Sequence, residues 1–195
     1  MIGLSAKRKI GTQLKTMERE EALNILHAKL KKGNLIKHSL ACEAGMRSIA
    51  THLGEDPDIW GLAGLLHDID YEEIDNVEEH GKKGAAFLKG KVDERIVSAV
   101  ERHTGYIEPK TTMDIALYAL DPLTGLIIAA MLMHPSKTLT GIDTKFVIKK
   151  FKQKGFARGA NREQILACGR IGIPLNDFVD IVLKAMQDIS GELTG

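Results

Sequence analysis

Hydrophobic residues recur at spacings of three and four along nearly the whole chain, and no segment keeps the period of two that marks a strand. This pattern predicts helices at about residues 16–30, 34–53, 57–68, 80–88, 93–103, 112–134, 144–154, 161–168 and 176–190. No internal repeat or low-complexity linker interrupts them. We therefore expect an all-α fold with a single domain.

Several helix ends carry the residues that helix ends need. An oxygen-bearing side chain just before a helix can accept a hydrogen bond from a backbone N–H that has no partner in the first turn. Gly54 follows the second helix, where a left-handed backbone conformation is needed, and Pro122 should kink or locally break the long helix. The predicted N-cap residues are Thr16, Asn34, Asp56 and Asp93.

Two of the buried stripes carry a residue that can titrate. His38 lies between Leu35 and Cys42 on an otherwise apolar face, so it should point inward. Asp121 shares a face with Leu117 and Ile128 and should also point toward the core.

Other imidazoles and carboxylates lie at predicted helix ends, and these are His67, Asp68, His80 and His103. Buried imidazoles and carboxylates cost free energy unless a positive charge lies among them, and one or two divalent metal ions would supply it. No thiolate stands at these positions, which argues against a structural zinc site.

Composition narrows the function and the location. The net charge is +1, from 27 basic and 26 acidic residues, so we expect no broad positive field for binding nucleic acid. Cys42 and Cys168 form no CxxC spacing, and the N-terminal MIGLSAKRKIG has no continuous apolar run, so we expect a cytoplasmic protein without a signal peptide. The apolar stretch 113–134 contains Asp114 and Pro122, which favours a core helix over a membrane span.

The order His38, His67-Asp68 and Asp121 resembles that of the HD-domain superfamily of metal-dependent phosphohydrolases, which is named for the His-Asp doublet. His80 and His103 look like the extra pair of its binuclear branches. The local strings AGLLHDID, EEHGKKGA, ERHTG and ALDPLTGLI are similar as well. The resemblance covers about residues 38–128, and residues 134–187 resemble a less characterised group of HD hydrolases.

This resemblance implies an HD-type helical bundle, with the metal site in residues 34–134 and a helical extension in 135–195. One ion (Fe, Mn, Ni, Co or Zn) would be held by His38, His67, Asp68 and Asp121. A second would be held by His80 and His103, with Asp68 as the catalytic bridge between the ions. The implied activity is that of a phosphomonoesterase or phosphodiesterase that uses a metal-bound hydroxide on a nucleotide or another small phosphorylated molecule. We expect a monomer or homodimer with no nucleic-acid or membrane partner.

Two other functions fit the same residues. Some HD-type proteins with this ligand set are di-iron oxygenases, and an HD site can also belong to a non-catalytic nucleotide-binding or regulatory module.

One difference from the family bears on the substrate. Many members continue the doublet as HDIGK, with a lysine that can approach phosphate, whereas Tyr71 stands at that position here.

The remaining polar residues have an ordinary and a functional interpretation. The acidic run from Asp70 to Glu79 is typical of a solvated loop, but Asp70 or Glu73 could hydrogen-bond a ligating histidine or act as a general acid. Lys137 and Arg158 are candidate substrate-binding residues if they are more than surface charges. Three further histidines fit no site position and should be surface or capping residues: His27, His52 and His134.

Overall fold

The computed structural model describes residues 17–194, and within that range every regular element is a helix. The predicted all-α fold is therefore confirmed. The predicted N-cap Thr16 and the stretch 1–11, on which the signal-peptide prediction rests, lie outside the described residues. The α-helices are α1 (Arg19–Lys29), α2 (Gly33–Leu53), α3 (Pro57–Leu66), α4 (Lys82–Leu88), α5 (Glu94–Arg102), α6 (Thr112–Met133), α7 (Thr144–Phe151), α8 (Arg162–Leu166), α9 (Leu175–Asp188) and α10 (Ser190–Thr194).

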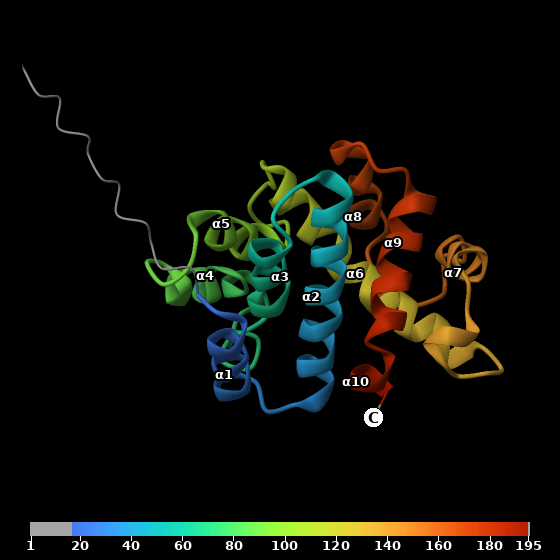
Figure 1. Ribbon diagram of the computed structural model, residues 1–195, viewed down its shortest axis with the longest axis horizontal. Coiled ribbons are helices and arrows are strands. Elements are labelled where there is room, and N and C mark those ends of the chain that lie inside the picture. The colour runs from blue at the N-terminus through green and yellow to red at the C-terminus, as the bar shows by residue number, and fades with distance from the viewer. Residues whose placement is uncertain (1–16, 195) are drawn as a thin grey trace, which may run out of the picture.

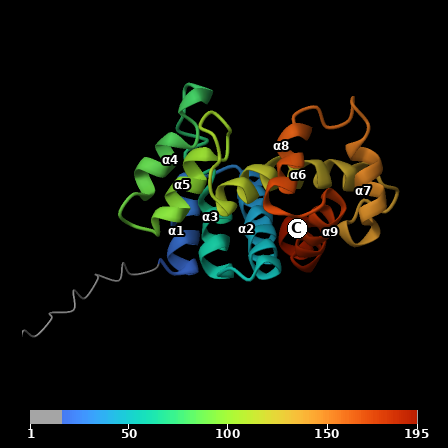
Figure 2. The same ribbon diagram turned by 90° about the horizontal axis from the view of Figure 1, so that it is seen from above.

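The long helix α2 stands between α3 on one side and α9 on the other, as Figure 1 shows. Seen from above, α6 runs from the α5 side of the molecule to the α7 side (Figure 2) and packs against both α2 and α5 on its way. Three 3-10 helices, η1 (Val77–Glu79), η2 (Leu139–Gly141) and η3 (Ala167–Ile171), lie in the connections. Helices α9 and α10 contact α2, so the C-terminal part of the chain packs on the same core.

The backbones of α2 and α3 approach each other very closely at Gly64. A Cβ atom added to Gly64 would lie 2.4 Å from the carbonyl oxygen of Cys42 and 2.8 Å from the backbone nitrogen of Glu43. Only a residue without a side chain allows this approach, because backbone atoms cannot move aside as a side chain can. The contact fixes the distance between the helix that carries His38 and the helix that ends at His67.

Most of the predicted helix ends are confirmed. The Asp56 side chain accepts from the backbone N–H groups of Asp58 and Ile59, and Asp93 accepts from Arg95. Gly54 ends α2 in the left-handed conformation, with φ of 72°.

The predicted N-cap of α2, Asn34, is wrong. The helix begins at Gly33, and the backbone N–H groups of Lys31 and Lys32, just before it, donate to the carboxylate of Glu72. The hydrogen-bond acceptor at the start of this helix is therefore a side chain about 40 positions away. Local sequence patterns cannot show such a distant partner.

Helix α6 runs without a break through Pro122, so the local break that we considered does not occur. Pro122 lacks an N–H and removes one helical hydrogen bond, but its neighbours Leu120 and Leu123 are fully buried, and their packing holds the helix together. Thr111 and Asp114 form a capping box at its start.

Among the described helices, α6 is long and apolar enough to cross a membrane by length and composition alone. However, 61% of its most apolar stretch is buried inside the protein, as expected of a core helix.

Replacing Gly64 with alanine should lower the free energy of unfolding by about 1–3 kcal/mol or more, because the added methyl group would meet the backbone of α2. Denaturant unfolding followed by circular dichroism measures this change. Gly125→Ala is the matched control, since no atom lies within 4 Å of a Cβ there and alanine should stabilise an exposed helix position by about 0.5–1 kcal/mol. Equal stability of the two variants would contradict the close approach.

Candidate metal centre

The fold brings all six predicted ligand residues into one cluster, although they come from separate parts of the chain. His38 lies on α2, and Asp121 lies in the middle of α6. His67 ends α3 and is followed by Asp68. The other two residues are His80, just before α4, and His103, which ends α5.

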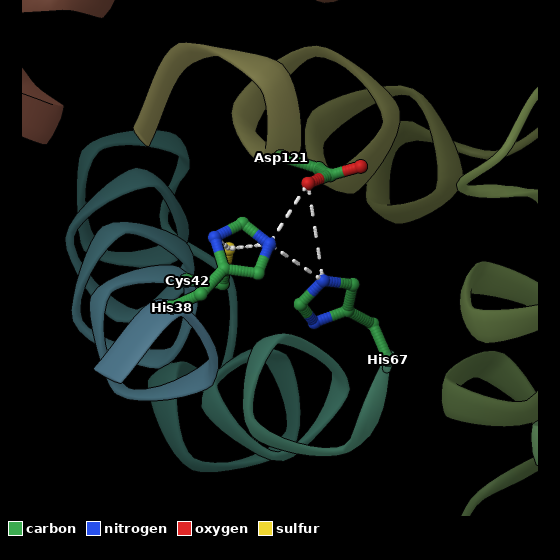
Figure 3. A group of neighbouring side chains, drawn as sticks. All are labelled: His38, Cys42, His67 and Asp121. Atoms are coloured by element: carbon green, nitrogen blue, oxygen red, sulfur yellow. Dashed lines mark hydrogen bonds and ion pairs between the residues drawn. The ribbon is translucent and has the colours of Figure 1, made fainter. Parts of the chain in front are cut away.

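One half of the cluster joins α2, α3 and α6. The Nε2 atoms of His38 and His67 face each other at 3.2 Å. The Oδ1 atom of Asp121 lies 3.0 Å from Nε2 of His38 and 3.9 Å from Nε2 of His67. Figure 3 shows the three side chains pointing toward one another from three helices.

The other half of the cluster contains the second imidazole pair. The Nε2 atoms of His80 and His103 also face each other at 3.2 Å. The Asp68 carboxylate lies between the two pairs, with Oδ1 3.1 Å from His80 and 3.2 Å from His67. Its other oxygen lies 3.6 Å from Nε2 of His38. One carboxylate therefore contacts both pairs, which is the position of a bridging ligand.

Hydrogen bonds fix the tautomer of the two buried histidines. The Nδ1 atom of His67 lies 2.8 Å from the carbonyl oxygen of Gly64, and Nδ1 of His103 lies 2.6 Å from that of Val100. A carbonyl oxygen can only accept, so each Nδ1 must carry the hydrogen. In the neutral ring, Nε2 then holds a lone pair that points into the cluster.

The other two histidines are fixed by side chains. His80 donates from Nδ1 to the carboxylate of Asp70 at 2.8 Å. The hydroxyl of Thr124 donates to the carbonyl oxygen of Asp121 at 2.9 Å, so its oxygen accepts from Nδ1 of His38 at 3.1 Å. All four rings thus present Nε2 to the cluster, and partners of this kind orient metal-binding histidines in general.

Two lone pairs that face each other at 3.2 Å repel unless a proton or a metal ion lies between them. Two ligands about 2.1 Å from one ion and about 90–110° apart are separated by about 3.0–3.4 Å. The two Nε2–Nε2 distances of 3.2 Å fit this separation, as do the shortest contacts of Asp121 with His38 and of Asp68 with His67 and His80. The distances from Asp121 to His67 (3.9 Å) and from Asp68 to His38 (3.6 Å) are wider. The side chains present therefore suit one ion at His38, His67 and Asp121 and another at His80 and His103, with Asp68 shared.

The electrostatics of the cluster also favour positive charge. Burial alone would lower the pKa of His67, but the charge and the hydrogen bond of Asp68, together with other neighbours, outweigh it and raise the pKa to about 10. Burial is likewise outweighed at His80, where hydrogen bonds to Asp68 and Asp70 raise the pKa to about 9. At Asp121, burial would raise the pKa, yet the hydrogen bond and charge of His38 lower it. A divalent ion satisfies these carboxylates while the imidazoles stay neutral.

Cys42 is a neighbour of the site whose role the sequence did not reveal. Its sulfur lies 3.9 Å from Nε2 of His38 and 3.8 Å from the hydroxyl of Thr124. The ligand atoms of His38, Cys42, His67 and Asp121 lie within 4.8 Å of one another. Cys42 lies four residues after His38, on the same helix face, but this spacing is equally typical of core packing and does not by itself indicate a metal ligand.

The acidic run after the doublet is only partly a solvated loop. Asp70 is buried, and besides His80 its carboxylate accepts from the backbone N–H groups of Gly81 and Gly84. The suggestion that Asp70 hydrogen-bonds a candidate ligand is therefore confirmed. Glu73 instead pairs with Lys29 at 2.9 Å, away from the cluster.

A cavity of about 470 Å³ opens over the cluster. It exposes parts of His38, Asp68, His80, His103 and Asp121, and its remaining lining consists of Leu35, Tyr71, Ile74, Val77, Thr104, Tyr106 and Gln164. Lys137 and Arg158 are exposed residues that do not line it. Their assignment to substrate binding stays a prediction.

The three histidines assigned to other roles lie apart from this cavity. His27 and His52 are exposed in the last turns of α1 and α2. His134 ends α6, where its ring contacts Phe146 and its Nδ1 is 2.8 Å from the hydroxyl of Ser136.

Comparison with known proteins identifies relatives of two kinds. A family model described as the HD domain matches residues 35–132, a range that contains all six cluster residues. An uncharacterized protein of Methanocaldococcus jannaschii is 31% identical over 178 residues, which cover 86% of this chain and 100% of that protein.

The second kind of relative is much longer. Ribonuclease Y of Alkaliphilus metalliredigens is 34% identical over 93 residues, and ribonuclease Y of Staphylococcus epidermidis is 35% identical over 95 residues. These matches cover 47% of this chain but only 20% and 18% of the two ribonucleases. The similarity to ribonuclease Y is therefore confined to one part of each protein.

Asp70→Ala should weaken metal binding at His80 and His103 by about 10- to 100-fold, because the ring of His80 loses the partner that orients it. Titration with Mn²⁺, followed by calorimetry, measures the affinity of each site. Asp75→Ala, an exposed position in the same loop, should change neither site. Two sites of unchanged affinity in a folded Asp70→Ala variant would contradict this role.

Proposed function

The chain belongs to the HD-domain superfamily of metal-dependent phosphohydrolases, and from that premise we propose that it hydrolyses a phosphoester bond in a nucleotide or another small phosphorylated molecule. The proposal includes two divalent transition-metal ions with Asp68 as the bridging ligand. We also propose a cytoplasmic location, since the two cysteines of the described chain are buried free thiols.

The observation that carries the proposal is the pair of facing imidazoles on each side of Asp68. In both pairs the Nε2 atoms lie 3.2 Å apart, and the hydrogen bonds at Nδ1 prevent the rings from turning these lone pairs elsewhere. A structural histidine in a core has no need of such an arrangement. The arrangement suits a two-ion site that handles a phosphoryl group.

When bound, the two ions would lower the pKa of a water ligand and neutralise charge on the phosphoryl oxygens. The residues of the chain hold the geometry for this chemistry. Asp68 is buried and keeps the two pairs together. Asp121 lines the cavity, and 27% of its side chain is accessible. In this proposal its carboxylate accepts a proton from the attacking water.

The cavity over the cluster agrees with a small substrate. Its volume of about 470 Å³ lies within the usual range for small-molecule sites. The substrate phosphate would lie at the floor, beside Asp68 and Asp121. The remainder of the substrate would extend along the apolar and aromatic wall described below.

The first test is a screen of the purified protein against phosphomonoesters and phosphodiesters in the presence of added Mn²⁺, Fe²⁺, Ni²⁺, Co²⁺ or Mg²⁺. We expect phosphate release or diester cleavage with at least one of these ions. Oxygen uptake by a protein with two irons, together with no release from any phosphoester, would overturn the proposal in favour of an oxygenase. Nucleotide binding without turnover would overturn it in favour of a regulatory module.

Asp68→Ala should abolish both metal binding and turnover, since the variant loses the one carboxylate that contacts both imidazole pairs. Metal content by elemental analysis and turnover on the best substrate of the screen measure the two effects. Asp75→Ala should retain both. Full activity with full metal content in Asp68→Ala would contradict the assignment.

A further inference from the structure

Strongly exposed hydrophobic side chains gather at the mouth of the metal-site cavity. Among the described residues, six large hydrophobic side chains are exposed, and three of them line this cavity. They are Tyr71, Val77 and Tyr106, with 48%, 54% and 55% of their surface accessible. Exposed apolar groups that line a site are candidates for contacts with a ligand.

Tyr71 is held rigidly beside the cluster. Its ring packs edge-to-face on the ring of His80, with centroids 5.1 Å apart and an angle of 85° between the planes. Its backbone N–H donates to the carbonyl oxygen of Asp68 at 2.9 Å. The turn that carries the bridging carboxylate therefore also positions this aromatic ring, and about half of the residue stays open to the cavity.

Tyr106 lies in the connection between α5 and α6, which is tied down at several points. Gly105 takes a left-handed conformation, with φ of 82°, that turns the chain after His103. The side chain of Arg102 donates to the carbonyl oxygen of Glu108 at 2.7 Å, and that of Arg170 donates to Pro109 at 3.0 Å. The backbone that carries the second ring is thus fixed before a ligand arrives, which reduces the entropy lost on binding.

The lining of the cavity contains no lysine or arginine among the described residues. Besides the two tyrosines and the cluster residues, the wall is formed by the apolar Leu35, Ile74 and Val77 and the uncharged polar Thr104 and Gln164. A wall of this kind offers no charge to a second or third phosphate of a substrate. It offers π faces and apolar surface, which suit a flat, weakly polar ring.

We propose that Tyr71 and Tyr106 form a stacking subsite for a planar aromatic group, such as a nucleobase, attached close to the single phosphate that the cluster holds. The subsite selects nucleoside monophosphates over aliphatic phosphoesters and over nucleoside triphosphates. This proposal rests on the proposed function for the place of the phosphate. Stacking itself requires neither turnover nor metal, so it can be tested apart from that function.

The binding test uses adenosine, which has no phosphate, with the purified protein and saturation-transfer NMR as the readout. We expect transfer to the base protons in the unmodified protein and its loss in Tyr71→Leu and Tyr106→Leu, which keep apolar bulk but lack the ring. Tyr71→Phe and Tyr106→Phe, which keep the ring, should retain it. Equal transfer in the leucine and phenylalanine variants would overturn the proposal.

The kinetic test compares adenosine monophosphate with glycerol phosphate. The leucine variants should raise KM for the nucleotide by about tenfold or more, a larger change than in KM for glycerol phosphate, which has no ring to stack. The phenylalanine variants should have the same kcat and KM as the unmodified protein. A loss of kcat in Tyr71→Phe would instead give the hydroxyl of Tyr71 a role in proton transfer and would contradict a stacking role.

The two proposals fail in different ways. Glycerol phosphate hydrolysis with no preference for the nucleotide would overturn the stacking subsite alone. No hydrolysis of any phosphoester would overturn the proposed function, while adenosine binding would still report on the subsite.

Discussion

The close approach of α2 and α3 at Gly64 is the constraint on which the site depends. The backbone of α3 lies against the carbonyl group of Cys42 because position 64 has no side chain. The same residue then gives its carbonyl oxygen to Nδ1 of His67. One glycine thus brings the two helices together and aims an imidazole at the helix beside it, so that His38 and His67 meet at 3.2 Å.

All four histidines of the cluster are oriented in the same way as His67, by a hydrogen bond at Nδ1. Each ring is held at Nδ1 by an acceptor that belongs to the scaffold: two backbone carbonyl groups, the hydroxyl of Thr124 and the carboxylate of Asp70. The Nε2 atoms are left to face one another and the carboxylate of Asp68. A buried group of lone pairs and carboxylates is unfavourable by itself and becomes favourable around positive charge. Folding and metal binding should therefore be coupled in this protein.

Local patterns in the sequence predicted the parts of this structure that depend on neighbouring residues. The helical periodicity placed His38 and Asp121 on inward faces, and Asp56 and Asp93 cap their helices as expected. Gathering the six cluster residues required the resemblance to a family, since spacing alone does not show that α2, α3, α5 and α6 converge. Long-range partners could not be predicted: Glu72 accepts from the N–H groups before α2 in place of Asn34, and Thr124 orients His38 from 86 positions away.

The same limit applies to the surroundings of the site. The acidic run from Asp70 to Glu79 contains six carboxylates, and nothing in the local sequence separates Asp70 from the other five. The sequence therefore predicts a solvated loop, although Asp70 is buried and accepts a hydrogen bond from His80. In the sequence, Tyr71 stands out only because it replaces the lysine that many family members carry at this position. Its meaning depends on Tyr106, which a different loop brings to the same cavity.

An anomalous diffraction measurement on crystals of the protein grown with Mn²⁺ would locate the ions themselves. We expect two peaks per chain, one near the Nε2 atoms of His38 and His67 and one near those of His80 and His103, with the Asp68 carboxylate between them. Each peak should lie about 2.0–2.3 Å from its ligand atoms. A map with no peak at these side chains, in crystals that hold Mn²⁺ elsewhere or not at all, would show that this cluster is not a two-ion site.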